Sequence, residues 1–370
     1  MSNPLRVTDF GYDLPAELIA QAPAQERDCS RLLLLDRGTG NLQHGLFCDL
    51  AELFTPEDLL VINDAKVFPA RLFGRSERLR SLEVLLTREI DTDCWEALIR
   101  PSRRVRPGDR LELADGTIEA HVLQQRGEGA HLLRLIHDGI LSDLLWRVGQ
   151  MPLPPYIKRK RSEFSVQSSG KDRQPSLASR PLADTRQSLD FERYQTVYAK
   201  HEGAIAAPTA GLHFTTELMD TLKQRGIRFA PITLYVGPGT FRPVRTESVE
   251  DHRVEPERYI IPEETATAIK AARHDGRRVI AVGTTTVRAL EHASTDGEVR
   301  AGAGTADLFI YPGYRFKIID ALITNFHLPR STLLMLVSAV AGRQRILAAY
   351  REAIARRYRF YSYGDAMMIA

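Results

Sequence analysis

The chain has 370 residues, of which 43% are hydrophobic and 26% are charged, and its net charge is +3. This length allows a large core and favours two domains, while the small net charge does not by itself indicate a nucleic-acid partner. The cysteines Cys29, Cys48 and Cys94 have neither paired nor metal-ligand spacing, which argues against a disulfide framework and predicts a reducing, cytoplasmic setting.

The first 68 residues predict one short helix, Pro15–Gln21, and two strands, Arg31–Leu35 and Asp58–Asn63. Both strands are almost continuously apolar, as expected where a strand is buried on two faces. The segment Met1–Leu5 lacks the basic and apolar pattern of a signal peptide.

Between about residues 70 and 150, short strands follow one another at close intervals, separated by turn signals such as Arg106–Asp109. The predicted strands are Ala70–Leu72, Leu82–Leu86, Trp95–Ile99, Arg110–Leu113, Thr117–Val122 and His131–Leu135. This pattern predicts a small all-β barrel domain over residues 69–151. The barrel would interrupt an α/β domain made of residues 1–68 and 152–370, in which the polar stretch 158–187 is predicted to be a mobile loop.

Strands and helices alternate in the second half of the chain, which predicts a mostly parallel sheet in the α/β domain. The predicted elements are a strand over Ile232–Val236, a helix over Pro262–Arg273, a strand over Arg278–Gly283 and a helix from Thr284 to Glu291. The run Leu333–Ala341 is far shorter than the ~20 residues that cross a bilayer, so it predicts a buried helix and no membrane partner.

The segment Pro208–Thr215 is a small-residue turn that delivers His213 to the start of a predicted helix, with Thr215 as its N-cap. Such a turn points backbone N–H groups at one spot and is suited to binding a polar ligand. An ordinary loop-to-helix junction with a hydrogen-bonded histidine explains the octapeptide alone equally well.

Further polar clusters follow strands or occupy turns, namely Asn63-Asp64, Gly283–Thr285, Thr324–Pro329 and Tyr361–Met368. Together they predict a polar site built from several loops. The sequence has no H-E-x-x-H pair, G-x-S-x-G elbow or Cys/His zinc spacing, which argues against a metalloenzyme or an ordinary serine hydrolase.

As a set, these motifs make the chain resemble the S-adenosylmethionine:tRNA ribosyltransferase-isomerases of queuosine biosynthesis. The resemblance runs nearly end to end. The matching segments are Asp9–Pro15, Arg27–Arg31, Asn63-Asp64, Val67–Leu72, Arg193–Tyr198, Pro208–Thr215, Gly283–Thr285, Ile310–Gly313, Ile323–Leu328 and Tyr363–Ala366.

The resemblance implies an α/β domain interrupted by a β-barrel and an enzyme that uses S-adenosylmethionine as co-substrate, with no prosthetic group and no metal. Its partner would be tRNA carrying 7-aminomethyl-7-deazaguanine at the wobble position, and we expect a monomer. The ribosyl group would be transferred to that base and rearranged to epoxyqueuosine, with release of adenine and methionine.

Residue type and motif position assign expected roles to three groups of residues. We expect catalytic roles for His213, Asp64, Asp365 and His327. Substrate contacts are expected from Thr209, Gly211, Thr215, Gly283, Thr284, Tyr311, Asn325 and Phe326. Contacts with tRNA are expected from Arg71, Arg103, Arg104, Lys158 and Arg193.

The chain departs from the family pattern at Ala65, Tyr235 and Glu255, where the family usually has a threonine and two histidines. Two other functions stay open at the level of sequence. One is a noncatalytic RNA-binding protein, and the other is an S-adenosylmethionine-dependent methyltransferase, against which the missing G-x-G-x-x-G fingerprint weighs.

Overall fold

The computed structural model describes residues 4–127, 129–159, 185–241 and 243–370, with the side chains of 185–188 and 241 left out. The chain divides into two compact units, Met1–Phe68 with Thr196–Ala370, and Pro69–Gln195. The domain boundary expected at residue 151 lies inside the second unit. Of the expected loop 158–187, residues 160–184 lie outside the described part, and α3 (Thr185–Arg193) begins directly after them.

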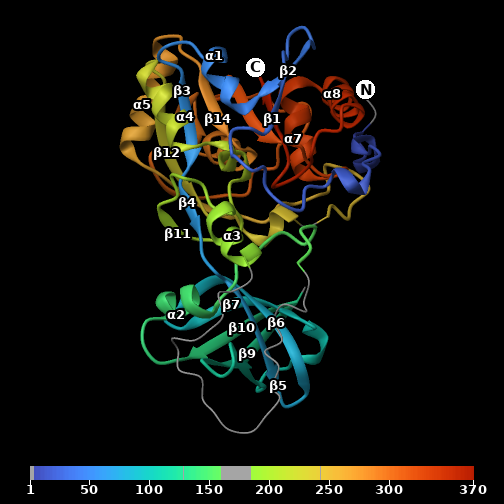
Figure 1. Ribbon diagram of the computed structural model, residues 1–370, viewed down its shortest axis with the longest axis vertical. Coiled ribbons are helices and arrows are strands. Elements are labelled where there is room, and N and C mark those ends of the chain that lie inside the picture. Colours follow the sequence, from blue (N-terminus) through green and yellow to red (C-terminus); the bar gives the residue numbers. More distant parts are fainter. Residues whose placement is uncertain (1–3, 128, 160–184, 242) are drawn as a thin grey trace. The chain divides into compact units, whose positions relative to one another are not determined.

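The first unit is built on a nine-stranded sheet of order β17-β13-β12-β3-β14-β18-β19-β1-β2 (Figure 1). Strands β12, β3, β14 and β18 run parallel to one another in its centre. Strand β19 pairs antiparallel with β18 and parallel with β1. Antiparallel pairs with β13, β17 and β2 complete the two edges. The strands are β1 Arg31–Leu35, β2 Leu42–Leu46, β3 Leu59–Asn63, β12 Arg228–Leu234, β13 Glu257–Ile261, β14 Val279–Val282, β17 Gly302–Ala306, β18 Ala321–Asn325 and β19 Ala366–Ile369. The mostly parallel centre confirms the predicted α/β sheet.

Shorter strands and helices surround this sheet. The short pairs are β4 (Ala65–Val67) with β11 (His201–Ala204) and β15 (Ser294–Thr295) with β16 (Glu298–Val299). The α-helices are α1 Leu50–Leu53, α4 Thr216–Gln224, α5 Glu263–His274, α6 Thr284–His292, α7 Thr332–Ala341 and α8 Arg343–Ala355. The 3-10 turns used below are η2 Ala16–Leu18, η3 Phe47–Asp49, η6 Thr209–His213 and η7 Pro238–Phe241.

Apolar side chains from alternate strand positions join the sheet to its helices. Leu60 and Ile62 of β3 pack in one buried cluster with Leu218 and Leu222 of α4. At about 25 cal/mol per Å² of apolar surface removed from water, such burial is the main favourable term that holds these layers together. The polar ends of the strands and the η6 turn are thereby held on a rigid scaffold.

Two local predictions met different outcomes. Thr215 is the N-cap of α4, and its Oγ1 accepts a hydrogen bond from the Leu218 backbone N–H at 3.0 Å, as predicted. The predicted helix Pro15–Gln21 is wrong beyond the single turn η2. The backbone N–H of Ala20 donates instead to Phe360 at 3.2 Å, so pairing with a distant segment replaces the helical hydrogen bonds.

The second unit contains a closed antiparallel barrel of six strands in the order β10-β7-β6-β5-β8-β9 (Figure 1). Its strands are β5 Arg71–Ser76, β6 Leu79–Asp91, β7 Cys94–Arg100, β8 Arg110–Leu113, β9 Ile118–Gly127 and β10 Ala130–Ile136, followed by α2 (Leu141–Val148). Each of the six strands predicted in this region is present, so the inserted barrel is confirmed.

No single helix in the described ranges is both long and apolar enough to cross a membrane. The consecutive helices α7 and α8 pass that test only as a pair, and the chain bends by 112° between them. In α7, Leu334–Ser338 and Ala341 are buried, which fits the predicted core helix.

Candidate functional site

The segment Pro208–Thr215 forms the 3-10 turn η6 and then the N-cap of α4. Gly211 is needed here because a Cβ at this position would lie 2.1 Å from the Tyr198 hydroxyl and 2.9 Å from Thr196 Cγ2. Only a residue without a side chain allows this close approach. The turn thus brings the segment around Tyr198 against the loop that carries His213.

His213 is 5% exposed, and both of its ring nitrogens have hydrogen-bond partners. Its Nδ1 lies 2.7 Å from Ser30 Oγ, and its Nε2 lies 3.1 Å from Asn325 Nδ2. Asn325 Nδ2 also donates to the carbonyl of Tyr361 at 3.1 Å, which fixes the orientation of the amide because a flipped amide would set Oδ1 against that carbonyl oxygen.

The amide orientation determines the tautomer of His213. Since Asn325 donates to Nε2, the imidazole proton lies on Nδ1 and is donated to Ser30. Ser30 in turn donates to the carbonyl of Arg27 at 3.2 Å. Nε2 is therefore the only ring atom of His213 that can accept a proton from a substrate.

Burial keeps this imidazole neutral. Loss of hydration lowers the pKa of His213 from 6.5 to about 4, an effect that the nearby Asp365 carboxylate only partly opposes. The ring of Phe47, whose centroid lies 5.0 Å away, forms one of the apolar walls. At pH 7 the side chain is a hydrogen-bonding group with one lone pair.

His327 follows Asn325 by two residues, and its surroundings hold it firmly. Its ring Nε2 lies 2.8 Å from Thr324 Oγ1. Its backbone N–H donates to the Tyr350 hydroxyl at 3.0 Å, and its backbone carbonyl accepts a hydrogen bond from the Tyr12 hydroxyl. Burial lowers the pKa of His327 to about 3. Its contacts position the turn that carries Asn325.

Asp365 is 1% exposed, and basic and backbone groups occupy both of its carboxylate oxygens. Arg31 Nη2 lies 3.0 Å from Oδ2 and Arg359 Nη2 lies 3.3 Å from Oδ1. The backbone N–H groups of the same two residues also donate to this carboxylate, at 3.2 and 2.8 Å. This arrangement ties the C-terminal segment to the start of β1.

Asp64 lies directly after β3 and is 7% exposed. Its Oδ1 accepts a hydrogen bond from Thr233 at 2.6 Å, and its Oδ2 lies 3.7 Å from His201 Nε2. Asn63 sets the local geometry by bonding both the N–H and the carbonyl of Leu234 at 2.9 Å. Asp64 is thereby held at the carboxyl end of a central parallel strand, where ligands bind in open α/β sheets.

The remaining expected substrate residues divide by location. Thr209, Gly211 and Thr215 belong to the η6 turn and its helix cap, and a Cβ on Gly283 would lie 3.9 Å from Ala210 Cβ in that turn. Thr284 is 6% exposed at the start of α6.

The rings of two expected aromatic residues, Phe326 and Tyr311, pack against other aromatic side chains of the first unit. The ring of Phe326 is fully buried, 5.0 Å from the ring of Phe360 and 5.2 Å from that of Tyr350. The ring of Tyr311 packs 5.2 Å from Phe309. Among the described contacts, neither ring is joined to the His213–Asn325 pair.

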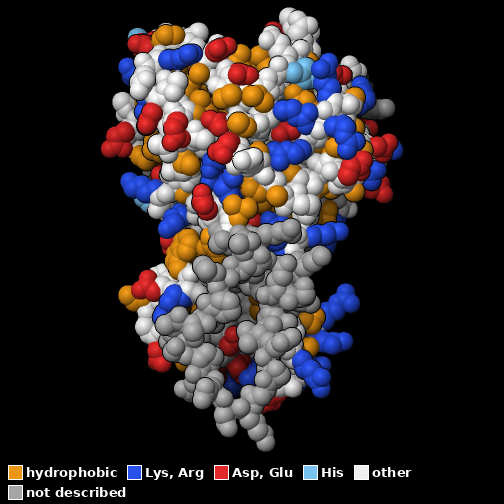
Figure 2. Space-filling view, in the orientation of Figure 1, with side chains coloured by type: hydrophobic (Ala, Val, Ile, Leu, Met, Phe, Trp, Pro, Cys, Tyr) orange, Lys and Arg blue, Asp and Glu red, His pale blue; other side chains and the backbone are white. Residues whose placement is uncertain are grey.

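The expected tRNA residues all lie in the second unit. Arg103 and Arg104 are exposed at the end of the turn η4 (Ser102–Arg104) beside the barrel. Figure 2 shows Lys and Arg side chains gathered along one edge of this unit. Arg193 is half-buried at the end of α3.

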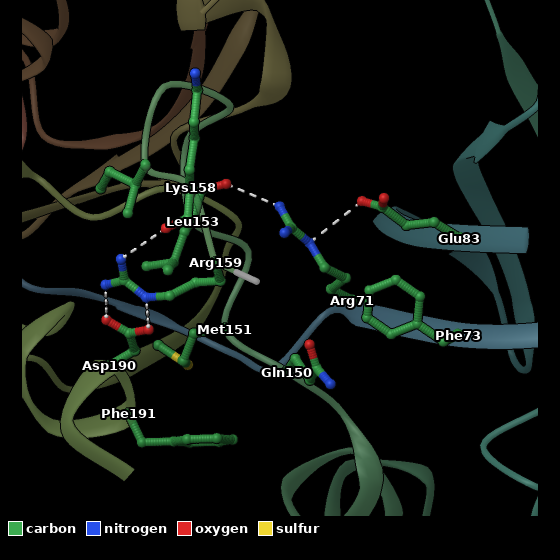
Figure 3. Close-up of a pocket in the computed structure, with 11 residues that line it drawn as sticks. Arg71, Phe73, Glu83, Gln150, Met151, Leu153, Lys158, Arg159, Asp190 and Phe191 are labelled. Atoms are coloured by element: carbon green, nitrogen blue, oxygen red, sulfur yellow. Dashed lines mark hydrogen bonds and ion pairs between the residues drawn. The ribbon is translucent and has the colours of Figure 1, made fainter. Parts of the chain in front are cut away.

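Arg71 and Lys158 line a cavity of about 420 Å³ within the second unit (Figure 3). Arg71 Nη2 donates to the Leu153 carbonyl at 2.8 Å, and its Nε lies 3.3 Å from Glu83. On the other side, Arg159 forms a bidentate pair with Asp190 at 2.7 and 2.9 Å. The cavity therefore combines charged groups with apolar walls that include Phe73 and Phe191.

The three departures from the family pattern have identifiable neighbours. Ala65 is fully buried in β4, and the guanidinium of Arg258 lies 5.1 Å from the ring centroid of Tyr235. A Cβ on Gly239 would lie 2.5 Å from Glu255 Oε2, so Glu255 packs closely against the η7 turn.

Several residues of this cluster were not among the expected site residues. Ser30 and Tyr361 contact the His213–Asn325 pair directly, and Thr196 and Tyr198 lie against Gly211. Tyr361 has a φ of 71°, which is rare for a residue with a side chain and presents its carbonyl to Asn325. Ser30, Thr196 and Tyr198 belong to segments that carried the family resemblance, and Tyr361 begins the polar C-terminal cluster, so these patterns were the available signal.

The described residues contain no group of three or more His, Cys, Asp or Glu side chains arranged to hold a metal ion. The polar cluster of the first unit is thus composed of hydrogen-bonding groups: two neutral histidines, an asparagine, hydroxyls and two carboxylates. Such a set can hold a polar organic substrate and exchange a proton with it at few points.

Comparison with known proteins places this arrangement in a family. A family model described as a queuosine biosynthesis protein matches residues 7–369. The chain is 50% identical to the S-adenosylmethionine:tRNA ribosyltransferase-isomerase of Trichlorobacter lovleyi, with 98% of this chain and 99% of that protein covered. It is 49% identical to the protein of the same name from Symbiobacterium thermophilum, with 99% and 100% covered.

A solved structure agrees with these sequence relatives. The crystal structure of S-adenosylmethionine tRNA ribosyltransferase from Thermotoga maritima is 36% identical, with a TM-score of 0.53 and coverage of 98% of this chain and 100% of that one. Fold, motifs and full-length similarity therefore agree, and the chain belongs to the family of queuosine biosynthesis proteins.

Proposed function

We propose that this chain transfers and isomerises the ribosyl group of S-adenosylmethionine onto 7-aminomethyl-7-deazaguanine at the tRNA wobble position. The products are epoxyqueuosine in tRNA, free adenine and free methionine. The observation that carries the proposal is full-length identity of about half to proteins named S-adenosylmethionine:tRNA ribosyltransferase-isomerase. The enzyme is thus a transferase and isomerase with S-adenosylmethionine as its co-substrate.

The reaction places four demands on the site. A base takes a proton from the carbon beside the sulfonium, whose positive charge acidifies that carbon, and a donor stabilises the departing adenine. The exocyclic amine of the modified base loses a proton as it bonds to the ribosyl carbon. The sulfonium is stabilised by a carboxylate or an aromatic face.

We assign proton exchange with the substrate to His213 through Nε2. This lone pair faces Asn325 in the free protein, so the substrate must displace the amide N–H to reach it. A base with a pKa near 4 is weak at pH 7, so the assignment is supported by position. His213 ends the η6 turn, and its Nε2 points at Asn325 at the end of β18. Asn325 then hydrogen-bonds the substrate, and Asp64 supplies a carboxylate at the same edge of the sheet.

Asp365 and His327 act as positioning residues in this proposal. Asp365 is occupied by two guanidinium groups, and His327 by Thr324 and two tyrosines, so each orients a segment that carries a substrate contact. Thr284 and the backbone of Gly283 contact the adenosyl part from the start of α6. Tyr311 and Phe326 contribute aromatic surface only if the substrate reaches them.

Binding of tRNA is assigned to the basic residues of the second unit. Arg103 and Arg104 are exposed and are proposed to contact phosphates, and Arg71, Lys158 and Arg193 are proposed to extend that surface. The proposal takes the enzyme to be a cytoplasmic monomer. Its three cysteines are unpaired, which suits a reducing compartment.

One experiment tests the function against its alternatives. The protein is incubated with S-adenosylmethionine and tRNA carrying the aminomethyl base, and the small products are identified by mass spectrometry. Adenine with methionine supports ribosyl transfer, whereas adenosylhomocysteine identifies a methyltransferase. Tight tRNA binding without any small product identifies a noncatalytic RNA-binding protein.

A variant tests the assignment of His213. His213→Asn should retain tRNA binding and suppress adenine release by about 100-fold or more, the typical contribution of a positioned acid or base. A folded variant with near-normal turnover contradicts the assignment.

A further inference from the structure

Three buried polar atoms around the η6 turn have no hydrogen-bond partner in the described protein. They are Thr196 Oγ1, Tyr198 Oη and Asn325 Oδ1. Thr196 is 4% exposed and Asn325 is 2% exposed. Buried polar groups are nearly always paired because an unpaired one costs free energy, so a cluster of exceptions calls for a specific explanation.

Short contacts link the residues that carry the unpaired atoms. Both Tyr198 Oη and Thr196 Cγ2 lie within 3 Å of the place a Cβ would take on Gly211. Two residues after Gly211, His213 bonds Asn325 at 3.1 Å. The glycine therefore makes room for the Tyr198 hydroxyl beside the loop that carries the proposed proton acceptor.

The electrostatic surroundings determine what these atoms offer. Burial raises the pKa of Tyr198, the Asp64 carboxylate raises it further, and the Arg27 guanidinium opposes this. Tyr198 is therefore a neutral phenol that donates its proton at physiological pH. The Thr196 hydroxyl both donates and accepts, and Asn325 Oδ1 accepts only.

Together, the Tyr198 hydroxyl, the Thr196 hydroxyl and Asn325 Oδ1 suit a ligand in which two neighbouring atoms can each donate and accept a hydrogen bond. A ribose diol has that character, and carboxylates beside hydroxyl groups are a common way to bind ribose. An adenine edge is a poorer match, because it has no adjacent pair of atoms that each both donate and accept a hydrogen bond.

We propose that Tyr198 and Thr196 bind the ribosyl hydroxyls of S-adenosylmethionine, with Asn325 Oδ1 accepting a further hydrogen bond from the same substrate. This inference rests on the proposed function and adds the segment Thr196–Tyr198 to the substrate site. It also explains the glycine at 211, since any larger residue would displace the Tyr198 hydroxyl.

The first test compares two matched tyrosines. Tyr198→Phe removes an unpaired hydroxyl, so its melting temperature should equal or exceed that of the wild type. Its KM for S-adenosylmethionine should rise at least about 10-fold, as when a site loses a hydrogen bond to substrate. Tyr350→Phe is the control, because its hydroxyl is bonded to the His327 N–H at 3.0 Å and its loss should lower the melting temperature.

A second variant and substrate analogues make the test specific. Thr196→Val should behave like Tyr198→Phe. The 2′-deoxy and 3′-deoxy analogues of S-adenosylmethionine are used as competitors of turnover. Loss of one of these hydroxyls should weaken inhibition of the wild type about 10-fold or more. The same loss should weaken inhibition of the Tyr198→Phe enzyme much less, because that enzyme already lacks the partner hydroxyl.

Three outcomes overturn the inference: unchanged kinetics in both variants, a melting temperature of Tyr198→Phe that falls as in the control, or equal losses with the deoxy analogues in wild type and variants. These are separable from failure of the proposed function. If the wild type releases neither adenine nor methionine, the function itself is wrong. If it releases both and Tyr198→Phe behaves normally, only the ribosyl contact is wrong.

Discussion

Acidification from pH 7 to pH 5 should destabilise the first unit through His213 and His327. Burial lowers the pKa of His213 from 6.5 to about 4 and that of His327 from 6.5 to about 3. Between those values and 6.5 the unfolded chain binds protons that the folded chain does not. Stability is therefore greatest above about pH 7 and falls as the pH drops through 6.5.

The size of this loss follows from proton linkage. At pH 5 an unfolded histidine of pKa 6.5 is almost fully protonated, while neither buried imidazole is. Linkage then gives a loss of roughly 2 kcal/mol for each histidine between pH 7 and pH 5, and about 4 kcal/mol for both. Against a typical stability of 5–15 kcal/mol, such a loss is easily measured.

Urea unfolding followed by far-ultraviolet circular dichroism at both pH values measures the effect. The only two tryptophans of the chain, Trp95 and Trp146, belong to the second unit, so their fluorescence follows that unit separately. His213→Asn should be less stable than the wild type at pH 7, and it should lose about 2 kcal/mol less on acidification. Comparing the two proteins cancels the contributions of other titrating groups.

The matched control is His274→Asn. The His274 side chain is 87% exposed at the end of α5, so it faces water before and after unfolding. This variant should show the same loss on acidification as the wild type. If His213→Asn also shows the wild-type loss, the imidazole is not held neutral by burial and the reasoning is refuted.

Three further predictions concern the site and the tRNA surface. Gly211→Ala should push the Tyr198 hydroxyl aside, destabilise the protein by about 1–3 kcal/mol and reduce kcat/KM, and wild-type kinetics with an unchanged melting temperature would refute the close approach. Asp365→Asn should lower the free energy of unfolding by roughly 2–4 kcal/mol because two guanidinium groups lose their shared partner; chemical denaturation checks this, and a change below 1 kcal/mol would count against it. Reversing Arg103 and Arg104 to glutamate should weaken tRNA binding. It should also reduce the slope of log affinity against log salt concentration by the equivalent of about one to two phosphate contacts. An unchanged slope would exclude this surface.

Local patterns in the sequence account for much of the fold. The apolar run of β3 and the close turn spacing of the barrel predict buried strands and short antiparallel strands without reference to the rest of the chain. The N-cap Thr215 is likewise a local feature, since its hydroxyl bonds a backbone group three residues away. Such features depend on interactions between residues that are close in the sequence.

Other features required the tertiary structure because they join distant segments. The C-terminal strand β19 lies between β18 and β1, parallel to one and antiparallel to the other, and no local pattern specifies that position. The predicted helix at Pro15–Gln21 shortened to one turn because Ala20 bonds Phe360 instead.

The candidate site shows the same division. The motifs located His213, Asn325 and Asp365 as polar residues at turns, which sequence reasoning identified from residue type and from family resemblance. Only the folded chain decides that His213 bonds Asn325, 112 positions away, and that Asp365 is enclosed by arginines. Hydrogen-bond partners, tautomer and burial depend on three-dimensional neighbours, and these control which groups can move a proton and which only hold their surroundings in place.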